Sequence, residues 1–321
     1  MNFIKRRILT SIIAFLAVVQ LDFFIPRLVP GTAAQILASG ATLSPSEVIA
    51  LTNRFGLNKP LIVQYSIYLK DVFTSWPPNF GNSYQYWPEP VTTLIMQRLP
   101  WTILLIVTSL ILASTISFVL AGISAVRRGG PIEMTSIYSS IFLWAIPAFW
   151  VGMILIWVFA VWLGWLPVFG NVGFNSGTGL NYISSVIIHA ILPVVTLTLS
   201  IFGVNYILLR GAAQQVLQSD FVIAAKVRGL KSSVIAFGYI LRNSLLPLVS
   251  LLGFSLASII SAAIPIESVF GYSGVGDLFL DGIGHRDIPV LEGCFFYLTI
   301  VVIAFALIGD FLLLRLDPRL R

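Results

Sequence analysis

Long uninterrupted runs of apolar residues constrain this chain more than any other feature of its sequence. A run of about 20 apolar residues matches the hydrocarbon thickness of a bilayer when it is helical. Backbone groups in lipid must be hydrogen-bonded internally, and the alternating pattern of barrel strands is absent, so each run predicts a transmembrane helix. Pro147 and Pro193 predict kinks in the third and fourth helices. The predicted fold is an all-α integral membrane protein with six transmembrane helices, at residues 8–25, 99–126, 134–163, 183–209, 248–266 and 293–314.

The composition supports a membrane location and argues against other classes. Of the 321 residues, 57% are hydrophobic and only 10% are charged, whereas charged residues make up about a quarter of an ordinary soluble domain. The net charge of +6 comes from basic residues dispersed among the loops, which attract anionic membrane lipid but form no patch for nucleic acid. The one cysteine, Cys294, excludes a disulfide within the chain and offers no metal site.

The distribution of Lys and Arg predicts the orientation of the helices. Most of the 19 basic residues lie near the two termini or in alternate loops, which predicts that these segments, and both termini, are cytoplasmic. The first run is longer than the apolar region of a secretory signal, so we expect it to remain as an anchor. The chain then divides into a cytoplasmic N-terminus with the first helix (1–25), an extracytoplasmic segment (26–98) and a core with five helices (99–321).

Two connections are long enough to carry function, and the first is the 26–98 segment. Ser46 predicts the start of a short helix that runs to Arg54, with Gly56 ending it, and Pro60 predicts the start of another. The aromatic residues that follow fit either an interfacial belt or contact with a soluble partner.

The second long connection, 211–246, contains two short predicted helices. Ser219 or Asp220 predicts the start of the first, and Gly229 predicts its end. The second is predicted to begin at Ser232 or Ser233. From the residues alone, this basic segment fits a solvated loop, an anchor on the lipid surface or a docking element for a cytoplasmic partner. The apolar face of the second helix is predicted to consist of Val234, Phe237, Leu241 and Leu245.

Several sequence blocks, in order along almost the whole chain, resemble one family of transport proteins. The stretch "IAAKVRG" at 223–229, followed by a Leu-Pro pair at the start of the next apolar run, looks like the EAA loop of ABC-transporter permeases. The further blocks are "GLNKPLIVQY", "NFGNSY", "LGWLPVFG", "LRNSLLPLV", "IESVFGYSGVGDLFLDGIGHRDIPVLEG" and a terminal "LDPRLR". The chain is similar to the B-type permease of dipeptide and oligopeptide importers.

The resemblance implies the type I ABC importer permease (MetI-like) fold and a transport role without an active site. It implies a heteromeric complex in the cell membrane of a bacterium or archaeon, with a second, C-type permease, two cytoplasmic ATPases and an extracytoplasmic substrate-binding protein. The ATPases would bind ATP and Mg, because this chain lacks the G-x-x-x-x-G-K-[ST] loop. Peptides are the expected cargo, with oligosaccharides or nickel as alternatives, and the chain itself is expected to bind no cofactor or metal.

The resemblance also implies particular site residues. In that family the EAA region docks into a groove of the ATPase, where small alanines permit close approach and Gly229 supplies a bend. Ile223 departs from the general consensus, which has an acidic residue at this position. By position, the coupling residues are Asp220, Ala224, Ala225, Gly229 and Leu230. A Gly-rich turn at the outer mouth is also implied, with Glu267, Gly271, Gly274 and Gly276 as candidate gate or binding-protein contacts.

Rival function classes find less support in the sequence. A receptor or assembly protein without transport would leave the ATPase-docking loop unexplained. A secondary transporter needs coupling carboxylates near the midplane and often has inverted repeats, and we find neither pattern. A serine hydrolase would use Ser273 and His285 with the nearby acidic residues Asp277, Asp281 and Asp287. However, Val275 stands where the G-x-S-x-G motif needs its last glycine. The sequence therefore predicts a transport subunit that is not itself an enzyme.

Overall fold

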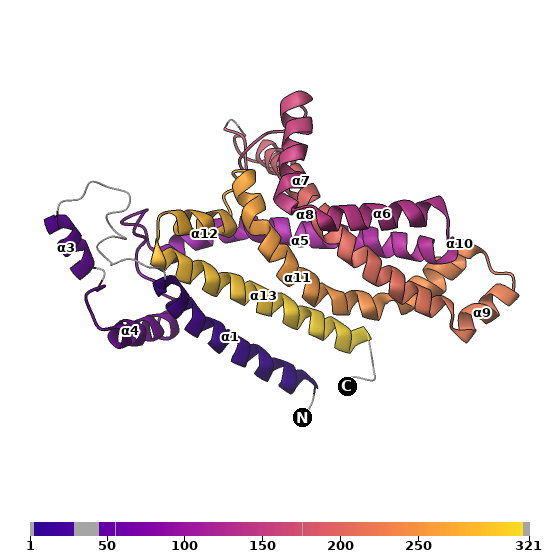
Figure 1. Ribbon diagram of the computed structural model, residues 1–321, viewed down its shortest axis with the longest axis horizontal. Coiled ribbons are helices and arrows are strands. Elements are labelled where there is room, and N and C mark those ends of the chain that lie inside the picture. The colour runs from indigo at the N-terminus through magenta and orange to yellow at the C-terminus, as the bar shows by residue number, and fades with distance from the viewer. Residues whose placement is uncertain (1–2, 29–44, 55, 175, 317–321) are drawn as a thin grey trace. The chain divides into compact units, whose positions relative to one another are not determined.

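The computed structural model describes residues 3–28, 45–54, 56–174 and 176–316, so the last five residues of the terminal "LDPRLR" block lie outside the described part. Helices dominate, and an isolated β-bridge joins Asn82 to Pro90. Two π-helical segments, η1 (Ile156–Trp162) and η2 (Ile235–Leu241), interrupt the α-helices. The α-helices are α1 (Phe3–Arg27), α3 (Pro45–Arg54), α4 (Leu61–Thr74), α5 (Val91–Val126), α6 (Pro131–Ala145), α7 (Ala148–Leu155), α8 (Leu180–Leu217), α9 (Asp220–Val227), α10 (Ser232–Val234), α11 (Leu245–Val269), α12 (Val275–Gly284) and α13 (Ile288–Leu316) (Figure 1).

Four of these helices, α1, α5, α8 and α13, are long and apolar enough to cross a bilayer. A fifth candidate is α6 together with α7 and η1, but the two parts are bent by 104°. Ile146 is extended because it precedes a proline (φ −94°, ψ 134°), and Pro147 has no N–H to continue the helix. The kink predicted at Pro147 is therefore a break, and the span predicted over 134–163 is a bent pair of helices.

The predicted count of six spans is not reached among the described residues. α11 runs from Leu245 to Val269, and it is not among the helices counted as spans in the described part of the chain. The described residues therefore give four spans, or five if the bent pair counts as one.

α8 is the central helix of one of the two compact units, which consists of Met1–Leu9, Thr102–Tyr272 and Val302–Arg321. It packs against α6, α7 and α11. Small hydroxyl residues allow helices to approach closely in lipid and to hydrogen-bond across the contact. Such bonds join α5 to α8 from Ser109 Oγ to the Val194 carbonyl (3.2 Å), from Ser117 Oγ to the Phe202 carbonyl (3.4 Å) and between Ser124 Oγ and Tyr206 Oη (2.8 Å).

The other unit, Thr10–Trp101 and Ser273–Val301, contains α3, α4 and α12. Both predicted helices of the 26–98 segment are present: α3 begins at Pro45, one residue before the expected Ser46, and α4 follows Pro60. Gly56, which was expected to end the first of them, adopts a left-handed φ of 66° in the turn between them, a conformation that glycine adopts without steric cost. Residues 29–44 and 55 lie outside the described part.

Acidic residues in and after α12 hold the end of the 26–98 segment. The Asp287 carboxylate is 1% exposed, and it accepts hydrogen bonds from Ser83 Oγ (2.5 Å) and from the backbone N–H groups of Tyr84 (2.9 Å) and Gln85 (3.0 Å). Tyr86 Oη donates to Asp281 at 2.7 Å. One buried carboxylate therefore organises three consecutive residues.

Candidate functional site

The 211–246 segment begins with a longer helix than the sequence predicts. α8 extends to Leu217, eight residues past the expected end at Leu209. The chain then turns at Ser219, whose carbonyl accepts from the Val222 and Ile223 N–H groups, and enters α9. Asp220 lies in the first turn of α9, where the helix dipole favours a negative charge. The first helix predicted in the 211–246 segment is therefore present and begins one residue before its expected position.

The end of α9 is a complete Schellman motif. Gly229 has φ +73°, and its N–H donates to the Lys226 carbonyl at 2.9 Å, while the Leu230 N–H donates to the Ala225 carbonyl at 3.3 Å. These two bonds satisfy carbonyls that the helix end leaves open. The predicted stop at Gly229 is confirmed, and the reason is the left-handed backbone conformation.

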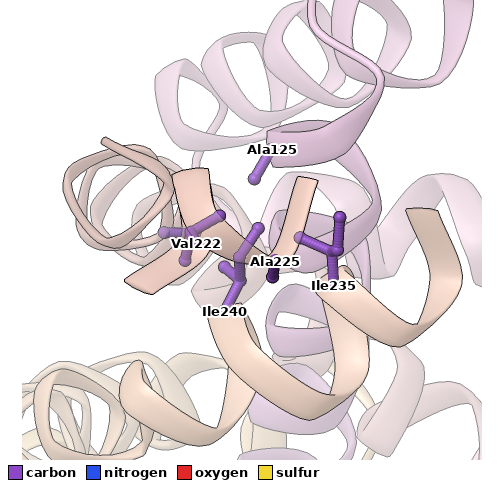
Figure 2. Close-up of a cluster of buried hydrophobic side chains, with 6 residues drawn as sticks. Ala125, Val222, Ala225, Ile235 and Ile240 are labelled. Carbon is purple, nitrogen blue, oxygen red and sulfur yellow. The ribbon is translucent and has the colours of Figure 1, made fainter. Parts of the chain in front are cut away.

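α9 rests on a buried hydrophobic cluster (Figure 2). Val222 and Ala225 point from α9 toward Ile235 and Ile240 of η2 and toward Ala125 near the end of α5. The cluster brings together the ends of α5 and α8 with α9 and η2. Its remaining members are Ala213, which is fully buried, and the partly buried Val126, Val216, Leu217, Leu230 and Tyr239.

The five predicted coupling residues divide into two groups. Asp220, Ala224 and Gly229 are exposed. Ala225 is only 3% exposed, and Leu230 is partly buried against the same cluster. The small side chain of Ala225 thus allows α9 to pack closely within its own chain, whereas Ala224 leaves the outer surface of the helix open.

The exposed side of α9 carries apolar residues that the motif did not single out as coupling residues. Phe221, Ile223 and Val227 are 45%, 49% and 83% exposed. Helical spacing predicts this for two of them, because Ile223 and Val227 are four positions apart and lie on the side opposite to Val222 and Ala225. Phe221 precedes Ala225 by four positions and lies at the edge of the buried side. Ile223, the position that departs from the general consensus, is therefore a surface residue. We name Ile223 and Val227 the apolar face of α9.

The predicted apolar face of the second helix is confirmed only at Leu241, and the side chain of Leu245 lies outside the described part. Val234 and Phe237 are exposed, and the buried residues are Ile235, Ala236, Ile240 and Leu241. The cause is a π-helical segment over 235–241, in which hydrogen bonds run from residue i to i+5. Ile235 and Ile240 are five residues apart and both face the cluster.

The other predicted set, Glu267, Gly271, Gly274 and Gly276, is distributed over two units. Glu267 is fully buried near the end of α11, and Gly271 turns the chain with φ +53°. Gly274 precedes α12 in the other unit, and Gly276 is buried in its first turn.

The acidic residues around His285 have structural partners. His285 Nδ1 lies 3.1 Å from Asp281 Oδ1, and Arg98 Nη1 lies 3.3 Å from Asp277 Oδ2. Burial raises the pKa of the Asp277 carboxyl, an effect that the Arg98 guanidinium opposes. Within the described residues, no three His, Cys, Asp or Glu side chains form a group that could hold a metal ion.

The helices and the polar contacts between them define an α-helical membrane protein whose α9 packs on the ends of two longer helices. Comparison with known proteins identifies its family. Residues 117–321 match the family model of the binding-protein-dependent transport system inner membrane component, and residues 1–106 match the model of its N-terminal region. The chain belongs to this family of transport permeases.

Individual relatives match along nearly the whole length of the chain. A probable peptide ABC transporter permease of Sinorhizobium fredii is 31% identical over 319 residues, covering 99% of both chains. An oligopeptide transport system permease of Bacillus subtilis is 34% identical over 318 residues, covering 99% of this chain and 98% of the relative. A nickel import system permease of Staphylococcus aureus is 31% identical over 320 residues, covering 98% and 90%.

Proposed function

We propose that this chain is one of the two different permease subunits of a type I ABC importer for peptides and forms half of the translocation pathway. The family assignment and the peptide transport systems among the relatives support this proposal. In the proposed complex, α11 and the bent α6–α7–η1 pair complete a set of six spans. The partners are a C-type permease, two ATPases that bind ATP and Mg, and an extracytoplasmic substrate-binding protein.

The proposed orientation places both termini and the 211–246 segment in the cytoplasm. Arg7 Nε on the second turn of α1 lies 3.5 Å from Asp310 Oδ1 in the last part of α13, so these two ends belong on one side of the bilayer. The basic residues of the 211–246 segment favour the same side. The 26–98 segment is then extracytoplasmic, where a binding protein would deliver its cargo.

The observation that carries the coupling role is the arrangement of α9. Its inner side is fixed to the ends of α5 and α8 through the buried cluster, while the apolar face of α9 is open. A short helix of this kind fits a groove in a partner protein. ATP-driven closure of the ATPases would move α9, and the cluster would transmit this movement to the membrane helices. The chain itself performs no chemical step.

Reconstitution tests the proposed function directly. The complex is purified with its four partner subunits, placed in liposomes and offered a mixture of short peptides, Ni²⁺ or maltotriose in separate experiments. We expect peptide uptake that requires both ATP and the binding protein. Uptake without ATP, or by this chain alone, would contradict an ABC importer, and ATP-dependent uptake of Ni²⁺ or maltotriose alone would contradict the peptide assignment.

Gly229 provides a second test, because its requirement is for backbone conformation and not for space. A Cβ added at Gly229 meets no atom within 4 Å, but φ +73° is unfavourable for β-branched residues. We expect Gly229→Val to abolish ATP-dependent uptake without preventing membrane insertion, and Gly229→Asn to retain much of the uptake, since Asn tolerates this conformation.

The control for this test is Gly164→Val. Gly164 has φ +65° and also leaves open space for a Cβ, but it lies outside the 211–246 segment. Uptake is measured at equal abundance of inserted complex. Normal uptake by Gly229→Val, or an equal loss in Gly164→Val, would contradict the role of this bend in coupling.

A further inference from the structure

A buried ion pair lies beside the cluster that supports α9. Glu133, in the first turn of α6, is 2% exposed. Its Oε1 accepts from Arg210 Nε at 2.7 Å, and Arg210 Nη2 lies 2.6 Å from the same oxygen. The two N–H groups converge on one carboxylate oxygen, and charge-assisted bonds of this kind are stronger than neutral ones. The pair joins α6 to α8.

Glu133 accepts two further hydrogen bonds besides those from Arg210. Its Oε1 also accepts from Gln214 Nε2 at 3.3 Å, and its Oε2 accepts from the backbone N–H of Gly129 at 2.5 Å. Gly129 belongs to the short turn between α5 and α6, and Gln214 lies one helical turn beyond Arg210 on α8. One carboxylate therefore joins the α5–α6 turn, the start of α6 and the end of α8.

The same helix ends carry the cluster beneath α9. Ala213 lies on α8 between Arg210 and Gln214, and Ala125 lies at the end of α5, just before the turn that Glu133 binds. A force on Val222 or Ala225 of α9 therefore acts on helix ends that Glu133 holds together. Without the hydrogen bonds of Glu133, α9 could displace the end of α8 while α6 stayed in place.

We infer that Glu133 and Arg210 are a positioning pair for energy coupling, which makes α6 move together with α8 when α9 moves. The inference rests on the proposed function. It assigns to two residues outside the predicted coupling set the task of passing movement from α9 to the membrane helices. Energetic coupling between distant sites requires contacts that favour one of two conformational states over the other.

The test measures uptake of the peptide mixture and ATP hydrolysis in the same liposomes. In Glu133→Gln and in Arg210→Gln we expect the amount of peptide transported per ATP hydrolysed to fall about tenfold, a typical coupling effect, while ATP hydrolysis continues. Because both substitutions break the same contact, the double variant should lose no more than the worse single variant. A merely structural role would lower uptake and hydrolysis in parallel.

Two further variants make the result decisive. Arg210→Lys keeps the charge but loses the guanidinium geometry, so the amount of peptide transported per ATP should fall less than in Arg210→Gln. If the Gln variants do not assemble, Arg210→Lys tests the inference in their place. Asp310→Asn breaks another ion pair of the same unit and should keep the wild-type ratio. Losses that multiply in the double variant, or an unchanged ratio in all variants, would overturn the inference. Failure of the wild-type complex to couple uptake to ATP would instead contradict the proposed function.

Discussion

Replacement of Asp287 by alanine is expected to release the 83–85 segment and to destabilise its unit by about 3 kcal/mol or more. The carboxylate is buried, and its loss deprives the N–H groups of Tyr84 and Gln85 and the hydroxyl of Ser83 of an acceptor. A buried polar group that loses its partner costs about 1–3 kcal/mol. Asp287 Oδ1 also accepts from the Val290 N–H at 3.3 Å, so the start of α13 loses a cap as well.

Limited trypsin digestion and thermal unfolding in detergent measure this effect. Cleavage after Lys70 should accelerate in Asp287→Ala, and the midpoint of unfolding should fall. Asp281→Ala is the matched control, because it removes only the contacts with Tyr86 and His285 and its side chain is 30% exposed. Equal cleavage rates and equal midpoints in the two variants would show that Asp287 does not hold the segment.

Burial disfavours the negative charge of the Asp287 carboxylate, whereas its hydrogen bonds favour that charge. It raises the pKa of the Asp287 carboxyl, while the bonds from Ser83 and from the backbone N–H groups act in the opposite direction. The carboxylate therefore depends on its donors. Asp287→Asn tests this dependence, because it keeps the size of the side chain but replaces one acceptor oxygen by a donor, and we expect it to be nearly as destabilising as Asp287→Ala.

Local signals in the sequence predicted the first part of the 211–246 segment. Asp220 at the helix start and Gly229 at its end fix α9 to within one residue, because capping depends on residues close in sequence. The long apolar runs likewise predicted α1, α5, α8 and α13. These features need no knowledge of distant parts of the chain.

Features that depend on tertiary contacts were missed. The face of η2 follows from packing against α9, and a search at the α-helical period placed Val234 and Phe237 on it although both are exposed. Glu133 and Arg210 are 77 residues apart, and neither residue belongs to a motif that would pair them. Asp281 and Asp287 were considered as parts of a catalytic set, whereas they bind the 26–98 segment, since a carboxylate near a histidine has the same sequence signature in both roles.

Replacement of Gly203 by alanine is expected to separate α6 from α8 and to destabilise their unit by about 2–3 kcal/mol, the usual cost of overpacking. A Cβ at Gly203 would lie 2.6 Å from the backbone carbonyl oxygen of Ser140. A backbone atom inside α6 can move only if the helix moves with it. The larger side chain in Gly203→Leu should prevent folding altogether.

The same substitution at two other helical glycines separates this clash from the effect of alanine itself. At Gly122 the added Cβ meets side-chain atoms of Leu241 at 2.6 Å, and at Gly309 it meets nothing within 4 Å. Since alanine favours a helix over glycine by about 1 kcal/mol, Gly309→Ala should be neutral or stabilising. Gly122→Ala should be intermediate, because a side chain can change its rotamer. Thermal midpoints in this order would establish that backbone contact sets the spacing of α6 and α8, and a Gly203→Ala midpoint equal to that of Gly309→Ala would refute it.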